Sequence, residues 1–452
     1  MKFKDFKLKF YSRFTDLSVF DCQDFNLLKV VLDGLLVNYT QKGKIRNRFL
    51  LFNLQHYLLG KRSRRNKKIS NSILSKEVLL LDSGRIDFDE DNQIVSSYFQ
   101  NILNDIRITS FAYATEKVIS EKINYDFNFF KCRYSYQYLL LTEEDKELIN
   151  ALKDKIKSLR SLNFFEDNEI KNIKISFQLF FYEFKAWNEI FKRSKFKKVY
   201  FLCHYHKEGF ILAAKRNKIE TIEIQHGIIS LSDVFYNFPP SIINKRSKLL
   251  FADKIKVYGK YWENKLIKGN CYTKDQINII GFNIYERREP NLVEKKELNT
   301  IIKGKKVILI TTQTSISKYF IEYAKFLSSE ISFQNKSIVI VMKLHPNEDV
   351  NPYNVLKDDS NIFITNITLG VLLNISSFHI SIYSTTLFDA LRYDNVINLS
   401  LFINDYSDYI FNIIESRVAY GININQTPWE LNIPLTQKLN PDNFYHSFKP
   451  FL

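Results

Sequence analysis

Strand-like and helix-like segments alternate regularly in the second half of the chain, and this alternation constrains the fold more than any other feature. Short apolar runs predict buried strands, and stretches with apolar residues at helical spacing predict the helices between them. Strands separated by helices in this way pair in parallel, with the helices covering the sheet. The expected strands are 307–311, 337–344, 361–365, 378–382 and 396–399, and the expected helices are 316–327, 369–373 and 386–393. The sequence therefore predicts a doubly wound α/β domain.

A similar pattern occurs earlier in the chain. Two strands around one helix, a βαβ unit, are expected at 198–203, 208–217 and 219–225. Other elements expected in this half are a buried strand at 78–82 and amphipathic helices at 140–162 and 177–193. Two such series predict two Rossmann-like α/β domains, with the boundary in the range 240–300.

The strand-like segments near 255–258 and 277–281 and the charged connector 285–306 are assigned to the start of the second series. A length of 452 residues is sufficient for two such domains with additional segments. The expected division is a basic helical extension at 1–75, an acceptor-binding domain at 76–250, a nucleotide-sugar domain at 251–410 and a tail at 411–452 that packs back on the first domain.

The chain is basic, with 65 Lys and Arg against 49 Asp and Glu and a formal net charge of +16. Two basic clusters, Lys42–Arg48 and Lys61–Lys68, lie in the extension. Such clusters are typical of a solvated positive face, of a membrane surface or of a nucleic-acid patch. We expect an anionic inner-membrane surface as partner and no nucleic acid, because no nucleic-acid motif of known geometry occurs.

Several protein classes are excluded by what the sequence lacks. It contains no G-x-G and no Gly-Lys-Ser/Thr, so neither a dinucleotide fingerprint nor a Walker A loop is present. Its four cysteines include no C-x-x-C pair, which indicates free thiols in a reducing compartment. No apolar run reaches the about 18 residues of a membrane span, and the start lacks the apolar region of a signal peptide. We therefore expect a cytoplasmic protein, peripheral on the inner face of the membrane.

Polar residues that follow the expected strands are the candidate site residues, because parallel sheets bind ligands beyond the carboxyl ends of their strands. The segments concerned are 222–227, 311–315, 343–346 and 382–386. In Lys343-Leu-His-Pro346, the proline restricts His345 to extended backbone angles. The hydroxyls of 384–386 and the following helix amides can hold a phosphate. The alternatives are a surface histidine beside a turn proline and an ordinary Ser/Thr helix cap.

Lys343-Leu-His-Pro346 followed by Ile382-Tyr-Ser-Thr-Thr-Leu-Phe-Asp-Ala-Leu391 resembles the His-Pro and Ser-Ser/Ser-Thr motifs of bacterial sialyltransferases, polysialyltransferases and related capsule transferases. A variant of the second motif occurs in CDP-glycerol glycerophosphotransferases. Residues 213–229 also resemble a stretch ending in Gln-His-Gly in capsule and O-antigen glycosyltransferases. The resemblance covers 198–400. It implies a GT-B fold, in which two Rossmann-like domains face a central cleft.

The resemblance also implies roles for individual residues. His345, Ser384 and Thr385 are expected to bind the donor phosphate. Further contacts at the same strand ends are expected from Lys343, Pro346, Thr386, Gln313 and Ser315. The sialyltransferases use an acidic pair before glycine as general base, whereas this chain has Lys207-Glu208-Gly209. Glu208 either acts as the base or opens its helix, and His226 competes for the role because a neutral imidazole is a good base near pH 7.

Two segments resemble metal sites. Asp87-Phe-Asp89 imitates a metal-binding D-x-D, but its polar surroundings favour a solvated turn. Cys203-His-Tyr-His206 lacks the distant fourth ligand of a closed zinc site. We therefore expect no metal and no cofactor.

These expectations favour a metal-independent, inverting glycosyltransferase of surface polysaccharide synthesis, such as capsule or lipopolysaccharide O-antigen. It would transfer a sugar from a nucleotide-sugar, favoured to be a CMP-sugar, to a glycan or lipid-linked glycan. One alternative is a CDP-polyol phosphotransferase of teichoic-acid-like polymer synthesis. Another is a non-enzymatic protein that binds nucleic acid or membrane through its basic extension.

Overall fold

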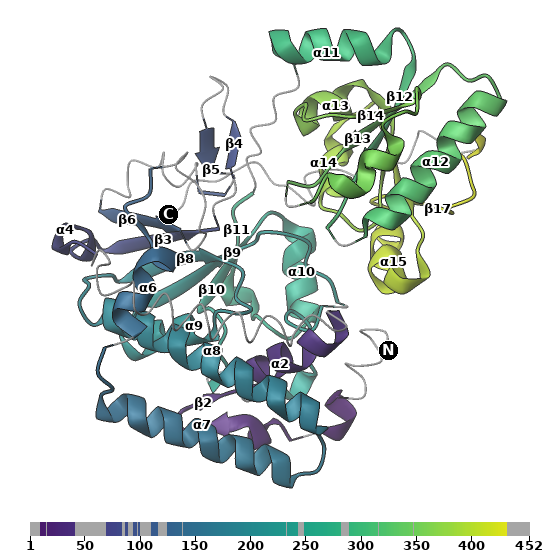
Figure 1. Cartoon of the computed structure of the whole chain (residues 1–452). Helices are drawn as coiled ribbons and strands as arrows, with labels where there is room; N and C mark the ends of the chain where they lie inside the picture. The colour runs from purple at the N-terminus through teal and green to yellow at the C-terminus, as the bar shows by residue number, and fades with distance from the viewer. Residues whose placement is uncertain are drawn as a thin grey trace. The chain divides into compact units, whose positions relative to one another are not determined.

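The structure is a computed structural model of the whole chain (Figure 1). It describes residues 10–14, 16–40, 69–83, 86–88, 94–96, 98–99, 110–115, 124–137, 139–231, 233–242, 248–281, 289–314, 316–346 and 348–431. The described residues up to 281 form one compact unit, and those from 289 onward form a second.

The first unit is built on a seven-stranded sheet with the order β11-β10-β9-β8-β3-β6-β7. Every neighbouring pair in it is parallel. The strands are β3 (Val78–Asp82), β6 (Phe111–Thr115), β7 (Phe127–Asn128), β8 (Lys198–Leu202), β9 (Glu220–Ile224), β10 (Lys254–Val257) and β11 (Ile277–Ile279). The strand order reverses between β3 and β8, the kind of position where Rossmann-like sheets bind ligands.

Long helices cover this sheet (Figure 1). They are α2 (Leu28–Thr40), α6 (Phe129–Gln137), α7 (Glu143–Ser161), α8 (Asp167–Phe191), α9 (Glu208–Arg216) and α10 (Lys260–Lys268), with the short α4 (Asn71–Leu74) before β3. Helix α8 packs against α2, α6, α7 and α9. Gly209 allows the approach of α9, because a Cβ at this position would lie 2.5 Å from the Phe180 carbonyl oxygen. Two small antiparallel hairpins complete the unit: β1 (Asp21–Cys22) with β2 (Phe25–Asn26), and β4 (Ile86–Phe88) with β5 (Ile94–Ser96).

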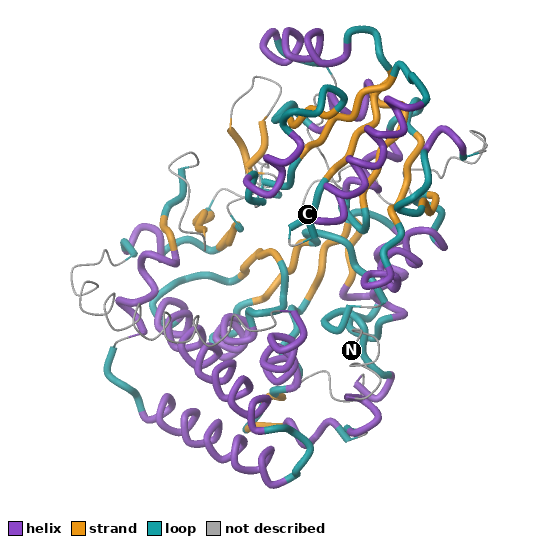
Figure 2. The backbone as a smooth tube through the Cα atoms, turned by 45° about the vertical axis from the view of Figure 1, so that its right-hand side comes forward, coloured by secondary structure: helices purple, strands orange, loops and turns teal. Residues whose placement is uncertain are grey.

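The second unit has a six-stranded sheet with the order β14-β13-β12-β15-β16-β17, again parallel throughout. Figure 2 shows its strands side by side between helices. Its strands are β12 (Lys306–Thr311), β13 (Ile338–Lys343), β14 (Ile362–Ile364), β15 (Ser376–Ser381), β16 (Ile397–Leu401) and β17 (Tyr420–Ile422). Its helices are α11 (Leu292–Ile302), α12 (Ser317–Phe333), α13 (Leu369–Ile375), α14 (Thr386–Asp389) and α15 (Ser407–Glu415).

The second sheet is buried on both faces, which explains its continuous apolar strands. Ile308 and Ile310 of β12 pack on one side with α12 and α15. Val307 and Leu309 pack on the other side with α11 and α13. Alternate residues of a strand point to opposite faces, so one strand contributes to both parts of the core. The strand order reverses between β12 and β15.

The predicted architecture of two Rossmann-like α/β units is confirmed by these two parallel sheets. The predicted βαβ unit corresponds to β8, α9 and β9. The central cleft that the resemblance implies stays a prediction.

The division of the chain differs from the expected one. Strands β10 and β11 pair with β9, so 254–279 complete the first sheet instead of starting the second domain at 251. Helix α2 packs against α8 and belongs to the first unit, not to a separate extension. The expected connector contains α11, and residues 411–431 extend the second unit with part of α15 and β17 instead of forming a tail. Residues 432–452 lie outside the described part.

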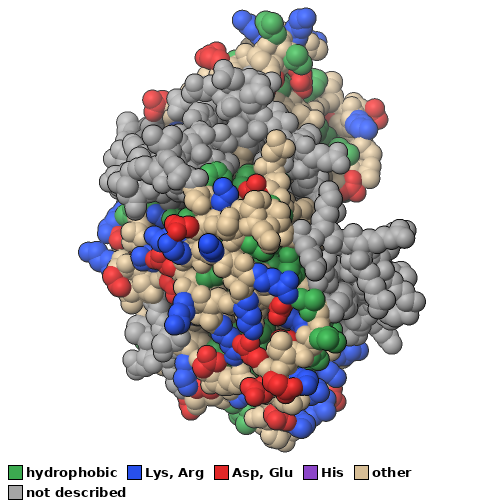
Figure 3. Space-filling model, turned by 90° about the vertical axis from the view of Figure 1, so that its left-hand side faces the viewer, with side chains coloured by type: hydrophobic (Ala, Val, Ile, Leu, Met, Phe, Trp, Pro, Cys, Tyr) green, Lys and Arg blue, Asp and Glu red, His purple; other side chains and the backbone are tan. Residues whose placement is uncertain are grey.

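Both basic clusters, at 42–48 and 61–68, also lie outside the described residues. On the face drawn in Figure 3, Lys and Arg side chains are interspersed with Asp and Glu. Across the described ranges, no helix combines the length and the hydropathy that a membrane span requires.

Candidate active site

The strand ends at the order reversal of the second sheet are joined by hydrogen bonds. The Tyr383 backbone N–H, after β15, donates to Gln313 Oε1, after β12, at 3.0 Å. Ser381 Oγ donates to the Thr311 carbonyl oxygen at 2.9 Å. The structure therefore brings the predicted segments 311–314 and 382–386 together at one edge of the sheet.

The predicted His345 lies at the end of the neighbouring strand β13 and is half-buried. Its backbone N–H donates to Thr312 Oγ1 at 3.1 Å and to Glu348 Oε2 at 3.2 Å. Glu348 also accepts hydrogen bonds from the Thr312 hydroxyl at 2.5 Å and from the Tyr353 hydroxyl at 2.6 Å. The carboxylate of Glu348 thus holds the turn that contains His345 and the exposed Pro346 against the end of β12.

Lys343 Nζ donates to the carbonyl oxygens of Ile367, at 2.6 Å, and Asn366, at 3.4 Å, in the loop after β14. These two bonds hold the loop. The expected role of Lys343 as a phosphate ligand stays a prediction.

A chain of hydrogen bonds inside the sheet fixes the direction of two hydroxyl groups. Buried His379 lies between Asn398 Oδ1, 2.7 Å from Nδ1, and Thr311 Oγ1, 2.9 Å from Nε2. Burial lowers the pKa of His379 to about 4, so the ring is neutral near pH 7. Because Asn398 Nδ2 donates elsewhere, Asn398 Oδ1 accepts from His379 Nδ1–H. Nε2 therefore accepts the proton of the Thr311 hydroxyl.

The hydroxyl group of Thr386 belongs to the same chain of hydrogen bonds. Its hydroxyl lies 2.8 Å from Thr311 Oγ1, which has already given its own proton to His379. In this arrangement Thr311 therefore accepts the Thr386 hydroxyl proton, and the expected phosphate contact of Thr386 stays a prediction.

Three predicted groups at this edge keep donors for a ligand. Ser384 Oγ accepts the Thr386 backbone N–H at 3.2 Å, as a helix cap does, and this bond does not use the hydroxyl proton of Ser384. The hydroxyl of Thr385 is half-exposed and makes no hydrogen bond within the described residues. Gln313 uses Oε1 for Tyr383, so its amide N–H groups remain. Ser315 lies outside the described residues.

In the first unit, the predicted His226 follows β9 and is half-buried. Its Nε2 lies 3.0 Å from the Tyr205 hydroxyl, and its carbonyl oxygen accepts a hydrogen bond from the Tyr98 hydroxyl at 2.9 Å. Tyr205 belongs to the turn between β8 and α9, so His226 stands beside the end of β8. Neither tyrosine contact was foreseen from the sequence.

Glu208, the other candidate base, begins α9 but is only 3% exposed. Its Oε1 lies 2.9 Å from Nζ of the equally buried Lys29, a residue of α2. Burial raises the pKa of Glu208, but Lys29 and His206 outweigh this effect and hold the pKa below its usual value. The lowered pKa favours the ionised carboxylate beside Lys29, and this favours a structural contact over proton transfer.

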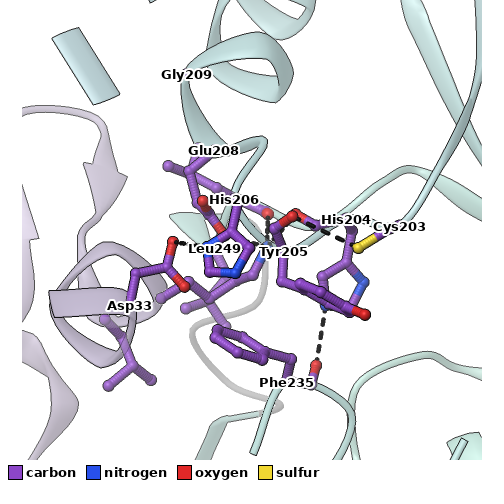
Figure 4. A network of polar contacts seen from close by, with 12 residues as sticks. Asp33, Cys203, His204, Tyr205, His206, Glu208, Gly209, Phe235 and Leu249 are labelled. Atoms are coloured by element: carbon purple, nitrogen blue, oxygen red, sulfur yellow. Dashed lines mark hydrogen bonds and ion pairs between the residues drawn. The ribbon is translucent and has the colours of Figure 1, made fainter. Parts of the chain in front are cut away.

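The turn between β8 and α9 is drawn in Figure 4. His204 is fully buried, with Nδ1 2.9 Å from Glu223 Oε2 and Nε2 2.9 Å from the Phe235 carbonyl oxygen. Glu223 also accepts from the hydroxyls of Tyr236 and Tyr272, and its pKa is lowered to about 2 by the His204 contact and these hydrogen bonds, against the effect of burial. His204 is thus part of the core. Of the other metal-like segment, Asp89 and the Asp87 side chain lie outside the described part.

Several residues that organise these sites were not predicted from the sequence. His379 lies inside an apolar strand, and only the strand register places it beside Thr311. Asp33 lies in a largely apolar helix, whose burial the structure alone reveals. Glu348 follows the His-Pro motif by two positions, and a search for acids beside strand-end histidines would have found it.

Neither a protein-family model nor a curated protein matches this chain. Several solved structures are similar to it. The UDP-GlcNAc 2-epimerase from Methanocaldococcus jannaschii, in complex with UDP-GlcNAc and UDP, is 11% identical over 81% of this chain and 96% of its own, with a TM-score of 0.49. The α,α-trehalose 6-phosphate synthase from Burkholderia multivorans is 10% identical over 81% and 90%, with a TM-score of 0.46. Anabaena HepE, in complex with UDP and glucose, is 10% identical over 76% and 90%, with a TM-score of 0.41.

Proposed function

We propose that this chain is a glycosyltransferase that uses a nucleotide-sugar donor, with a CMP-sugar favoured. The observation that carries the proposal is the set of hydrogen-bond donors on Ser384, Thr385 and Gln313, held together at the order reversal of the second sheet. Parallel sheets bind nucleotides at this position. The His-Pro and Ser-Thr motifs, which resemble those of bacterial sialyltransferases, lie at the same edge.

The transfer is a single displacement that inverts the anomeric carbon. The acceptor hydroxyl oxygen forms the new bond to that carbon, and its proton passes to a base, for which we propose His226. The bond from the anomeric carbon to the phosphate oxygen breaks, and its electron pair leaves with the nucleotide. The phosphate gains negative charge in this step, and fixed donors stabilise it in the transition state. A metal ion is not required for this stabilisation.

The acceptor is a glycan or lipid-linked glycan of bacterial surface polysaccharide, held by the first unit. The basic clusters of the N-terminal part would dock the enzyme on the anionic inner face of the membrane, where lipid-linked acceptors occur. This part of the proposal rests on the resemblance and on composition.

A thermal-shift screen with CMP, CDP, UDP, GDP and their sugars tests the function. A ligand that binds only the folded state raises its stability by RT ln(1 + [L]/Kd), so a bound nucleotide raises Tm. We expect the cytidine nucleotides to give the largest shifts. If no nucleotide or nucleotide-sugar shifts Tm, the proposed function is refuted.

A further inference from the structure

The first unit contains a cavity of about 410 Å³ that the sequence did not indicate. Its walls come from α2, α6, α8 and the turn between β8 and α9. The volume lies within the range of about 300–1,000 Å³ that small-molecule sites occupy. Eight of the thirteen lining residues are polar or charged, and Phe129, Phe180 and Tyr182 supply aromatic rings.

Two buried oxygen atoms of the lining residues lack a hydrogen-bond donor. Asp33 is 9% exposed and Gln137 is 7% exposed, and within the described chain neither Asp33 Oδ1 nor Gln137 Oε1 accepts a hydrogen bond. The remaining polar atoms of both side chains are engaged: Asp33 Oδ2 with His206 Nδ1 at 3.0 Å, and Gln137 Nε2 with the Tyr182 carbonyl oxygen at 3.3 Å. A buried acceptor without a donor destabilises the folded protein, because it has lost its hydrogen bond to water. The cavity is thus suited to a ligand that brings hydroxyl or amide donors.

His206 supplies a hydrogen-bond donor, in contrast to the acceptor oxygens of Asp33 and Gln137. Figure 4 shows its ring pointing toward Asp33. Burial lowers its pKa, but the hydrogen bond and charge of Asp33, with Glu208 and Glu183, raise it to about 9. The ring is therefore an imidazolium near pH 7. Its Nδ1–H donates to Asp33, and its Nε2–H, on a side chain that is 64% exposed, remains for a ligand oxygen.

The backbone that presents His206 is strained. Cys203 and His206 have φ angles of 64° and 60°, in the left-handed region that residues other than glycine rarely adopt. Such strain persists only where surrounding contacts hold it, and it is concentrated at ligand and active sites. Here the Asp33 ion pair holds the His206 end of the turn.

The apolar part of the cavity wall is rigid. The ring of Phe129 stacks on buried Trp187, with centroids 4.1 Å apart, and Phe180 packs near Phe25 at 5.7 Å. These rings are fixed by their neighbours and offer a preformed surface to the apolar C–H groups of a ligand.

Charge around the cavity is balanced, which selects against a strongly ionic ligand. Lys29 pairs with Glu208, and His206 pairs with Asp33, whose own pKa is raised to about 7 by burial and by the charge of Glu208. Arg133, Lys207 and Glu183 also line the cavity. A neutral ring with several hydroxyl groups satisfies both the free acceptors and the imidazolium donor.

We propose that this cavity binds a sugar residue of the acceptor, with Asp33 and Gln137 accepting hydrogen bonds from its hydroxyl groups. The proposal rests on the proposed glycosyltransferase function. The cavity also lies near the proposed base, because the Tyr205 ring is 5.4 Å from that of His206 and 5.7 Å from that of His226. Asp33 and Gln137 are binding residues in this account, and His206 donates to a sugar oxygen.

Saturation-transfer NMR with an equimolar mixture of galactose, glucose and N-acetylglucosamine tests the proposal on the full chain without an activity assay. We expect saturation transfer to at least one sugar in the wild type, and a loss of most of that signal in Gln137→Leu and in Asp33→Asn. Gln178→Leu, an exposed glutamine on α8 outside the cavity, is the matched control and keeps the signal.

No transfer to any of the sugars in the wild type, or equal transfer in wild type and Gln137→Leu, overturns the proposal. If the Asp33→Asn variant fails to fold, the Gln137→Leu variant still tests the proposal. Nucleotide titration of the same samples separates the two proposals. If the protein binds a nucleotide but no sugar, only the proposed sugar site is refuted. If it binds a sugar in this cavity but no nucleotide, the proposed glycosyltransferase function is refuted.

Discussion

Lys29 and Glu208 form a buried ion pair, with 2.9 Å between Lys29 Nζ and Glu208 Oε1. Lys29 Nζ also donates to the carbonyl oxygens of His204, at 3.1 Å, and Leu250, at 2.7 Å. One ammonium group therefore joins α2 to the turn after β8 and to the segment before β10. This contact encloses Glu208 in the protein.

Lys29→Met is expected to destabilise the chain by about 3–5 kcal/mol, because it leaves the Glu208 carboxylate buried without its partner. Lys146→Met, which breaks an exposed pair with Glu143, is the matched control and should cost at most about 1 kcal/mol. Urea unfolding measures both. A Lys29→Met chain as stable as the control would show that Glu208 is accessible to solvent.

His379 predicts a pH dependence of stability. Its folded-state pKa of about 4 lies below its usual value of 6.5, so the unfolded chain binds more protons between these values. The free energy of unfolding therefore falls as pH decreases from about 6.5 to about 4. His379→Gln removes this contribution, and urea unfolding at pH 7, 6, 5 and 4 should give a shallower pH dependence than for the wild type. Parallel curves would contradict a buried neutral imidazole.

The hydroxyl groups of Ser384 and Thr385 are expected to bind the donor phosphate. Ser384→Ala combined with Thr385→Ala should lower kcat about 10²-fold, the scale of a lost transition-state donor, with little change in Tm. His345→Ala is expected to have an effect of similar size. Thr300→Ala, on the surface of α11, should leave kcat unchanged. Steady-state kinetics with the identified donor provide the check, and near-normal turnover of the double variant would return Ser384 to a capping role alone.

Chelation tests the proposed absence of a metal from the mechanism. Turnover should be the same before and after dialysis against EDTA, because Ser384, Thr385 and Gln313 supply the donors to the leaving phosphate. Activity that disappears with EDTA and returns with Mn²⁺ would contradict this part of the mechanism.

The sequence predicted the second unit well because its strands are buried on both faces and appear as continuous apolar runs. It did not predict α11, whose only strongly buried apolar side chains are Leu298 and Ile301, or the short β6. The division between the units falls between 281 and 289, inside the expected range 240–300 but not at 251, because the pairing of β10 with β9 cannot be read from local pattern. Pairing between distant strands is a tertiary property.

The sequence predicted the candidate site residues where they directly follow a predicted strand. Gln313, Ser384 and Thr385 lie together as the parallel sheet requires. The states of Thr386, Lys343 and Glu208 depend on Thr311, on the loop after β14 and on Lys29, which are remote in sequence. Hydrogen-bond direction and burial decide whether a polar residue is available, and neither is visible in a motif.

The central claim is that the edge formed by Ser384, Thr385 and Gln313 holds the donor's phosphate. Isothermal titration calorimetry of CMP, CDP, UDP and GDP against the wild type and the Ser384→Ala/Thr385→Ala variant tests it most directly. The account predicts that CMP or CDP binds most tightly to the wild type and at least about tenfold more weakly to the variant, a loss of about 1.4 kcal/mol. Tighter binding of UDP or GDP would contradict the cytidine donor, and equal binding of every nucleotide to both proteins would contradict the central claim.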